Sequence, residues 1–301
     1  MRLDHCIENL LNATPQHLSD LRLNRLLAAL TDADRAQWQP YLEAVDLRAG
    51  QVLSESGATS AHAYFPTTAI VSLLYRTEDG AAAEIAVVGN DGVVGMSLFM
   101  GGAATPGQAV VQSAGLAYRM NARAVRDAVQ RSGPALTTML RYAQALIAQV
   151  AQTAVCNRYH SIDQQFARRL LVGLDRSASD ELVMTQEGVA QLLGVRREGV
   201  TAAALRLQEA GVIRYRRGHI AVLDRPRLEQ QACECYGVAR REYDRLLPAP
   251  QPALAQREHS CGSLHVAAPS PGGRALHNLT PAQHRRCTTP THSGPCCAMP
   301  A

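Results

Sequence analysis

Between about Leu21 and Ser132 the chain alternates short apolar segments with turn residues. Apolar or alternating segments recur at 63–66, 69–75, 83–88, 108–112 and 116–120, and Asp79-Gly80 separates two of them. Segments of this length, with Asp-Gly as a hairpin signal, are typical of antiparallel strands. The pattern predicts an α+β protein with an antiparallel barrel or roll over residues 21–133. A leading helix is expected over 21–42, because four leucines share one face: Leu23, Leu26, Leu27 and Leu30.

Beyond Gly133-Pro134 the apolar positions recur at steps of four and three. This period predicts a long helix within residues 134–160, with an apolar seam at Leu136, Leu140, Ala143, Ile147, Val150 and Ala154. We expect the seam to pack against the same helix of a second copy, which would make a homodimer. A helix that packs only on its own sheet is the alternative.

The segment from Met184 to Leu223 predicts two short helices and a hairpin. Thr185 is a capping residue, and the apolar positions that follow it stop at Gly194. A second helix runs to Gly211, with Val200, Ala204 and Leu207 expected to face the core. Two helices joined by a tight glycine turn form a helix-turn-helix, and the strands after them form a wing, so residues 161–248 are predicted to be a winged helix-turn-helix domain.

The chemistry of this segment suits double-stranded DNA. An arginine can hydrogen-bond both acceptors of a guanine, and a glutamate can accept from a cytosine amine, so we expect base contacts from Arg196, Arg197, Glu198 and Thr201. Phosphate contacts are expected from the first helix, the second helix and the wing, at Thr185, Arg206, Arg216, Arg217 and His219. The alternative is a solvated basic helix whose charges pair among themselves, for example Glu198 with Arg197.

All 30 lysine and arginine positions of the chain are arginine. The absence of lysine excludes Schiff-base and P-loop chemistry. Coding bias explains most of these arginines, but the charge is unevenly distributed: residues 1–100 carry −6, residues 101–248 carry +7 and residues 249–301 carry +3. Six arginines and two glutamates lie between residues 196 and 217, which favours nucleic-acid binding there.

The remaining segments are expected to carry no cofactor and no metal. Residues 1–20 form an N-terminal extension, and the proline-rich and histidine-rich tail 249–301 is predicted to be disordered. The tail histidines and cysteines lack the spacing of a zinc site, and Cys233 and Cys235 make a close pair without other ligands. Only Cys6 precedes Cys156, so a four-thiolate iron–sulfur cluster is not expected within the ordered half.

No apolar run suits a membrane span or a signal peptide, and we expect a cytoplasmic protein.

The stretch Leu193-Gly-Val-Arg-Arg-Glu-Gly-Val-Thr201 resembles the recognition helix of the Crp/Fnr family of bacterial transcription regulators. The resemblance extends from about Leu21 to Leu247. It implies that the N-terminal domain is a jelly-roll-like, cyclic-nucleotide-binding-like β-roll that acts as a sensor. A dimerisation helix, a winged helix-turn-helix and contact with RNA polymerase are implied as well. It also implies that Arg197 and Glu198 form the pair that reads bases. The chain is therefore predicted to be a homodimeric regulator that binds a palindromic operator, and not an enzyme.

The sensor half departs from the cyclic-nucleotide binders of that family. Those members carry a Gly-Glu pair for the ribose and an arginine for the cyclic phosphate, whereas the corresponding positions here are Gly95, Met96, Ser97, Gln108 and Ala109. A buried phosphate without a cation is costly, so we expect a small-molecule effector other than cyclic AMP. The alternative function is a cyclic-nucleotide-binding module that regulates a protein partner.

Overall fold

A computed structural model gives the structure of the chain and describes residues 20–102, 104–177 and 179–247. The expectations for the N-terminal extension before residue 20 and for the tail 249–301 lie outside the described residues.

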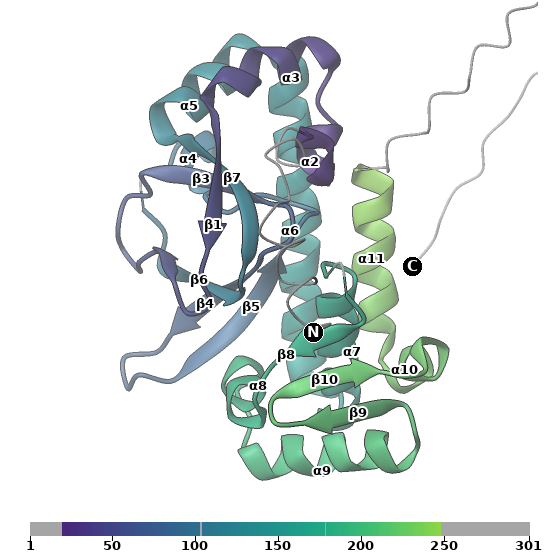
Figure 1. The fold of residues 1–301 in the computed structure, drawn as a ribbon. Coiled ribbons are helices and arrows are strands. Elements are labelled where there is room, and N and C mark those ends of the chain that lie inside the picture. Colours follow the sequence, from purple (N-terminus) through teal and green to yellow (C-terminus); the bar gives the residue numbers. More distant parts are fainter. Residues whose placement is uncertain (1–19, 103, 178, 248–301) are drawn as a thin grey trace, which may run out of the picture. The chain divides into compact units, whose positions relative to one another are not determined.

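Two antiparallel sheets form the first half of the described chain (Figure 1). The three-stranded sheet has the order β1 (Leu42–Leu47), β7 (Gly115–Asn121), β3 (His62–Pro66). The four-stranded sheet has the order β2 (Val52–Ser54), β6 (Gly107–Ser113), β4 (Ile70–Arg76), β5 (Ala82–Val88). Asp79-Gly80 lies in the turn between β4 and β5. The predicted antiparallel roll is confirmed, and the strands β1 and β2 are additions to the prediction.

The single helix expected over 21–42 is wrong. This segment is divided into η2 (Leu21–Leu23), α2 (Arg25–Ala28), α3 (Asp32–Trp38) and η3 (Gln39–Tyr41). Asn24 is fully buried, accepts from the backbone amides of Leu26 and Leu27, and donates to the carbonyls of Pro66 and Gly92. Its side chain therefore caps the start of α2 and ties it to the roll, while its backbone amide donates to the Leu21 carbonyl at the end of η2. Leu23, expected on the apolar face, is 48% exposed.

Two helices that the strand pattern did not predict follow in the roll: α4 (Ser97–Met100) and α5 (Ala122–Arg131). The long helix α6 (Gly133–Tyr159) comes next, as predicted, with the Ser132 hydroxyl capping its first turn. Its buried side packs on α5, on β5 and on the last helix of the described chain. The first core of the protein lies between α6 and the roll, around Trp38, Phe65 and Tyr142.

The second half of the chain has its own core and a small sheet. The elements are, in order, α7 (Ile162–Leu174), β8 (Glu181–Val183), α8 (Gln186–Leu193), α9 (Arg197–Glu209), β9 (Ile213–Arg216), β10 (His219–Val222), α10 (Arg225–Gln231) and α11 (Glu234–Leu246). The sheet has the order β8, β10, β9. Helix α11 then runs alongside α6 (Figure 1).

Among the helices described, none combines the length and the apolar character that crossing a bilayer requires.

Candidate nucleic-acid interface

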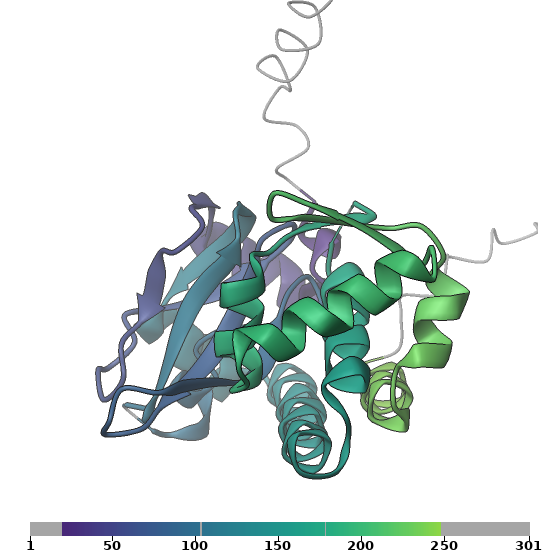
Figure 2. The same ribbon diagram turned by 90° about the horizontal axis from the view of Figure 1, so that it is seen from below.

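Helices α8 and α9 form the predicted helix-turn-helix. The Thr185 hydroxyl accepts from the Gly188 amide at 3.0 Å, and Gly194 ends α8 in the left-handed conformation. Helix α9 begins three residues later, at Arg197, with Arg196 as its N-cap. Val200, Ala204 and Leu207 are at most 6% exposed, so the predicted buried face of α9 is confirmed. The opposite face is presented outward, and Figure 2 shows α9 lying across the face of the molecule seen from below.

The exposed side of α9 forms one wall of a groove. Arg197, Thr201 and Gln208 recur at steps of four and seven, so they share a side of the helix. The groove is completed by the start of α8 and by the wing, through Gln186 and Arg217. The Thr201 hydroxyl lies 2.8 Å from the Gln186 side-chain oxygen and 3.0 Å from the Arg197 carbonyl, to which it can donate. These contacts fix the start of α8 against α9.

Glu198 and Arg196 are exposed, and together with Arg197 they line a second hollow. The other wall of that hollow is the β4–β5 hairpin of the roll, with Gly80, Ala81 and Ala82. Each helical residue rotates by about 100°, so Glu198 is turned by about 60° to 100° from Thr201 and Arg197 around the helix. The recognition helix thus presents one side toward the wing and another toward the roll.

The predicted role of Arg206 does not fit its position. It lies nine residues after Arg197, which places it about 180° around α9. There its guanidinium forms an ion pair with Asp163 of α7 at 2.6 Å. A phosphate contact from Arg206 would require this pair to open, and the residue instead fastens α9 to α7.

The wing is a hairpin with a two-residue turn at Arg217-Gly218. Both residues have positive φ, 50° for Arg217 and 83° for Gly218. Arginine rarely adopts this conformation, whereas asparagine or glycine tolerates it, so the wing tip stores some backbone strain. Arg214 and Arg216 alternate along β9 and line one hollow with His219, whose Nδ1 lies 3.1 Å from Glu181.

The arginines of this surface have no carboxylate partner within the described part of the chain. They are Arg196, Arg197, Arg214, Arg216 and Arg217. The alternative of a salt bridge between Glu198 and Arg197 is not realised there. Arg197 and Arg217 line the groove, Arg214 and Arg216 lie with Arg217 on the hairpin, and Arg196 lines the hollow beside the roll. Unpaired guanidinium groups such as these can bind an anion, since no internal charge has to be displaced.

Sequence reasoning missed Arg214 and Gln208 as members of this surface. Strand alternation could have found Arg214, because it lies two residues before Arg216 on β9. Gln208 lies on the side of α9 that carries Thr201, and its Oε1 accepts from the Tyr215 amide at 3.0 Å. Only the fold brings that strand to the helix.

The predicted apolar seam of α6 divides into two sets. Leu140 is 51% exposed, Ile147 is 58% exposed, and Ala154 is exposed one heptad later. Ala143 is 4% exposed, so its predicted place in an intersubunit seam is wrong, because the side chain is buried within its own chain. Leu136 and Val150 are half-buried against the first core. In Figure 2 α6 is seen nearly end-on, at the edge of the ribbon.

The positions assigned to a degenerate effector pocket lie at the start of α4 and on β6. Gly95 has φ of 101° and approaches the backbone of His62 and Ala63, while Met96 packs on the first core and Ser97 begins α4. Ala109 is buried on β6.

Gln108 carries the polar chemistry near this site. Its amide donates to Glu55 at 2.7 Å and its oxygen accepts from Arg76 at 3.3 Å. Arg76 of β4 lies beside these positions, and its guanidinium donates to Gln108.

Two buried ion pairs join the roll to α7 and the segment after it. Arg169 binds Glu84 of β5 with 2.6 Å between Nε and Oε1, and Arg176 binds Asp91 with 2.6 Å between Nη2 and Oδ2. Burial alone would lower the pKa of Arg176, but the Asp91 carboxylate and the buried Tyr243 raise it above its ordinary value. The guanidinium therefore stays charged inside the protein.

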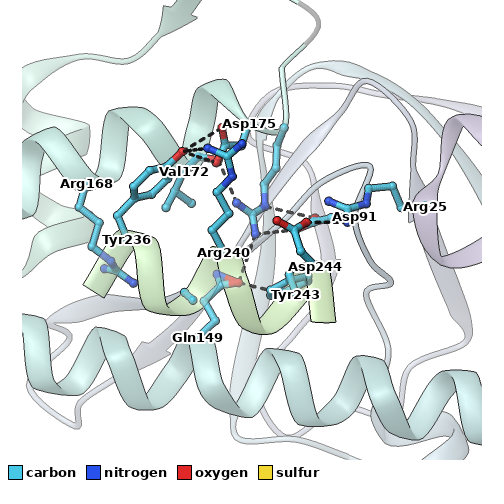
Figure 3. Close-up of a pocket in the computed structure, with 12 residues that line it drawn as sticks. Arg25, Asp91, Gln149, Arg168, Val172, Asp175, Tyr236, Arg240, Tyr243 and Asp244 are labelled. Carbon is cyan, nitrogen blue, oxygen red and sulfur yellow. Dashed lines mark hydrogen bonds and ion pairs between the residues drawn. The ribbon is translucent and has the colours of Figure 1, made fainter. Parts of the chain in front are cut away.

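The Arg176 pair lies at a cavity of about 180 Å³ formed by α6, α7 and α11 (Figure 3). Gln149 of α6 accepts from both Arg176 and the Tyr243 hydroxyl at 3.3 Å, and the Val172 carbonyl accepts from Arg176 at 3.0 Å. The junction thus connects the roll, the long helix and the second half of the chain through one set of side chains.

A cluster of possible metal ligands lies where the end of α6 meets the start of α11. The expectation that Cys233 and Cys235 lack other ligands is wrong, because Cys156 and His160 lie beside them. The four ligand atoms are within 4.8 Å of one another. Cys156, Cys233 and Cys235 are free thiols.

Comparison with known proteins finds two family models in the order of the two halves. A cyclic nucleotide-binding domain matches residues 44–132, and a Crp-like helix-turn-helix domain matches residues 164–231. The comparison with curated protein sequences found no match.

Solved structures share the fold at low sequence identity. FixK2 from Bradyrhizobium japonicum is 14% identical with a TM-score of 0.55, and the alignment covers 64% of this chain and 98% of that chain. TTHA1359, a Crp/Fnr family transcriptional regulator from Thermus thermophilus, is 22% identical with a TM-score of 0.52, covering 63% and 98%. The regulator CLP from Xanthomonas campestris is 14% identical with a TM-score of 0.52, covering 64% and 99%. The two domain matches together span just over half of the residues, in the order found in the fold, and the chain belongs to the Crp/Fnr family of DNA-binding transcription regulators.

Proposed function

We propose that this regulator binds a palindromic operator as a homodimer and that the groove beside α9 receives the DNA. The observation that carries the proposal is the set of five unpaired arginines on α9 and the wing. A recognition helix enters the major groove by its N-terminal residues, which here are Arg197 and Glu198. Arg197 would take both acceptors of a guanine, and Glu198 would accept from a cytosine amine.

The phosphate contacts are assigned to the wing and to the start of α8. Arg216 and Arg217 project from the hairpin, and the strain at Arg217 supports a function for an arginine at that position. Thr185 caps α8, whose amide groups face the same groove. His219 would contribute after release from Glu181.

The dimer would form along the exposed stripe of α6. Leu140, Ile147 and Ala154 lie one heptad apart, so they form a straight line along one side of the helix. Exposed leucine and isoleucine side chains at this spacing are typical of a surface that a second helix covers. Two copies related by a two-fold axis would place two recognition helices on successive half-sites of one DNA face.

The effector signal would travel from the roll to the recognition helix by two routes. The ion pairs of Glu84 and Asp91 hold α7, which packs on α9, and the β4–β5 hairpin borders the hollow beside Glu198. A ligand that binds one arrangement of the roll more tightly shifts the orientation of α9 and hence the affinity for DNA. Contact with RNA polymerase would convert binding into regulation.

The effector is proposed to be a small molecule other than cyclic AMP. Neither a carboxylate for the ribose nor a free guanidinium for the phosphate is present at Gly95, Met96, Gln108 or Ala109. Binding of cyclic AMP at micromolar affinity in a calorimeter would contradict this assignment. It would favour the alternative, a cyclic-nucleotide-binding module that acts on a protein partner.

The proposed reading role is tested with duplexes selected by the protein from a random pool. Replacing Arg197 by alanine should weaken specific binding by about 1–3 kcal/mol, roughly 5- to 150-fold, and relax the preference at one base position. Arg126→Ala is the matched control, because this exposed arginine lies on α5, away from the groove. Equal selectivity of the Arg197 and Arg126 variants would refute the assignment.

The proposed phosphate contact of the wing is tested by the salt dependence of the affinity for DNA. Arg217→Asn places a residue that tolerates positive φ at the hairpin tip, so the fold should be retained. Loss of one phosphate contact should reduce the slope of log affinity against log salt by about 1, with little change in sequence preference. An unchanged slope would remove Arg217 from the interface.

A further inference from the structure

The ends of two helices bring three cysteines and one histidine together. Cys156 and His160 lie one turn apart at the end of α6, and Cys233 and Cys235 lie at the start of α11. The two cysteine sulfurs of Cys156 and Cys233 are 3.5 Å apart, and the Cys235 sulfur is 3.5 Å from Nδ1 of His160. The cysteines are at most 5% exposed and form a separate buried cluster.

These distances fit the edges of a coordination tetrahedron. Zinc–sulfur bonds of about 2.3 Å and zinc–nitrogen bonds of about 2.0 Å give edges of about 3.8 Å between two sulfurs and about 3.5 Å between sulfur and nitrogen. All four ligand atoms lie within 4.8 Å of one another, which leaves room for a single ion and not for an iron–sulfur cluster. A shift of a few tenths of an ångström would complete the tetrahedron.

The histidine is oriented as a metal ligand by a carboxylate. Nε2 of His160 lies 3.2 Å from Oε1 of Glu234, so this nitrogen carries the proton and Nδ1 faces Cys235 with a free lone pair. Metal-binding histidines commonly donate their other ring N–H to a carboxylate in this way. Glu234 lies between the two cysteines in the sequence and is exposed, so it does not compete as a ligand.

A buried arginine supplies the charge that such a site needs. Three thiolates and a neutral histidine around a divalent ion leave one negative charge. Arg168 is 8% exposed, acts electrostatically on Cys156 and Cys235, and has no carboxylate partner in the described chain. Its Nη2 donates to the Thr153 hydroxyl at 3.0 Å, while its Nε has no partner among the described residues. A buried guanidinium of this kind is costly unless an anion compensates it.

We propose that Cys156, His160, Cys233 and Cys235 bind one Zn²⁺ ion as a closed structural site. Sulfur and imidazole donors in a tetrahedron select zinc among the common divalent ions, and a buried Cys₃His set leaves no open position for catalysis. The ion fastens the start of α11 to the end of α6. It thereby holds the last helix of the DNA-binding half against the helix proposed to form the dimer.

The proposal is tested by metal analysis of the full chain purified in reductant without chelator. We expect about one zinc per chain, and Co²⁺ in its place should give the intense visible bands of tetrahedral thiolate coordination. Cys233→Ser with Cys235→Ser should abolish the bound zinc. The control replaces the tail cysteines Cys261, Cys287, Cys296 and Cys297 by serine and should retain it. A chain without zinc that gives no such bands with Co²⁺, or zinc lost only in the tail variant, would overturn the proposal.

A second variant leaves all four ligands in place and is expected to fold. Glu234→Gln removes the carboxylate from His160, and it should weaken zinc binding 10- to 100-fold in competition with a chromophoric chelator. Glu209→Gln is the matched control, an exposed glutamate at the end of α9. Equal affinity of the two variants would contradict the site.

Discussion

The buried pair of Arg176 and Asp91 offers the sharpest test of how the roll is joined to the DNA-binding half. Replacing Asp91 by asparagine removes the negative charge but keeps the shape of the side chain. The asparagine retains one oxygen, which can still accept the hydrogen bond that the Gly89 amide donates to Asp91 at 3.0 Å. The Arg176 guanidinium then remains buried, with both side chains of the pair at most 10% exposed. Its other partners are Gln149 and the Val172 carbonyl, which are neutral.

The expected loss of unfolding free energy in Asp91→Asn follows from these surroundings of Arg176. Breaking a buried ion pair by removing one partner costs about 3–5 kcal/mol. Since two neutral acceptors and the Tyr243 ring remain around Arg176, we expect the lower end, about 3 kcal/mol of unfolding free energy. For a domain structure of this size the midpoint of thermal unfolding should fall by about 6–12 °C.

Urea denaturation followed by circular dichroism and by the fluorescence of Trp38 measures the loss. Glu242→Gln is the control, because its ion pair with Arg245 lies at the surface within one helix and should contribute little. The double variant Asp91→Leu with Arg176→Met should recover most of the stability, since it removes both charges. An Asp91→Asn variant as stable as the Glu242 control would refute the reasoning.

Three further predictions concern the dimer helix, the turn before α4 and the buried tyrosines. Ile147→Asp should convert the dimer into monomers in sedimentation experiments. Leu223 is a comparably exposed apolar residue elsewhere, so Leu223→Asp should leave the dimer intact. An unsubstituted protein that sediments as a monomer would contradict the dimer. Gly92→Ala should cost about 1–3 kcal/mol, because a Cβ there would lie 2.3 Å from the buried Tyr142 ring, while Gly133→Ala, which meets open space, should be neutral in the same urea titration. Burial raises the pKa of Tyr243 well above 10, so its stabilising contribution is complete below the unfolded value of about 10 and is lost as the pH rises beyond it. Tyr243→Phe should therefore flatten the fall in unfolding free energy above pH 10, and parallel pH curves for the two proteins would exclude this tyrosine as a cause.

The sequence by itself determined the elements whose signals are local. The hairpin at Asp79-Gly80, the long helix after Pro134 and the helix-turn-helix around Gly194 were all predictable, because turn residues and side-chain period act within a few residues of the chain. The segment 21–42 was mispredicted since Asn24 is held in an extended conformation between two short helices, with its side chain bonded to Pro66 and Gly92, and no local pattern contains these contacts.

The tertiary structure decided which residues of one chemical type act together. Arg168, Arg169 and Arg176 are buried at the junction with the roll, whereas the arginines of α9 and the wing remain unpaired, although all are the same residue in the same basic half. Cys156 meets Cys233 across 77 residues of sequence, and Leu140 faces outward while Ala143 faces inward on one predicted seam. The partner of a charge, a thiol or an apolar side chain is set by packing between distant segments, and sequence spacing does not encode that packing locally.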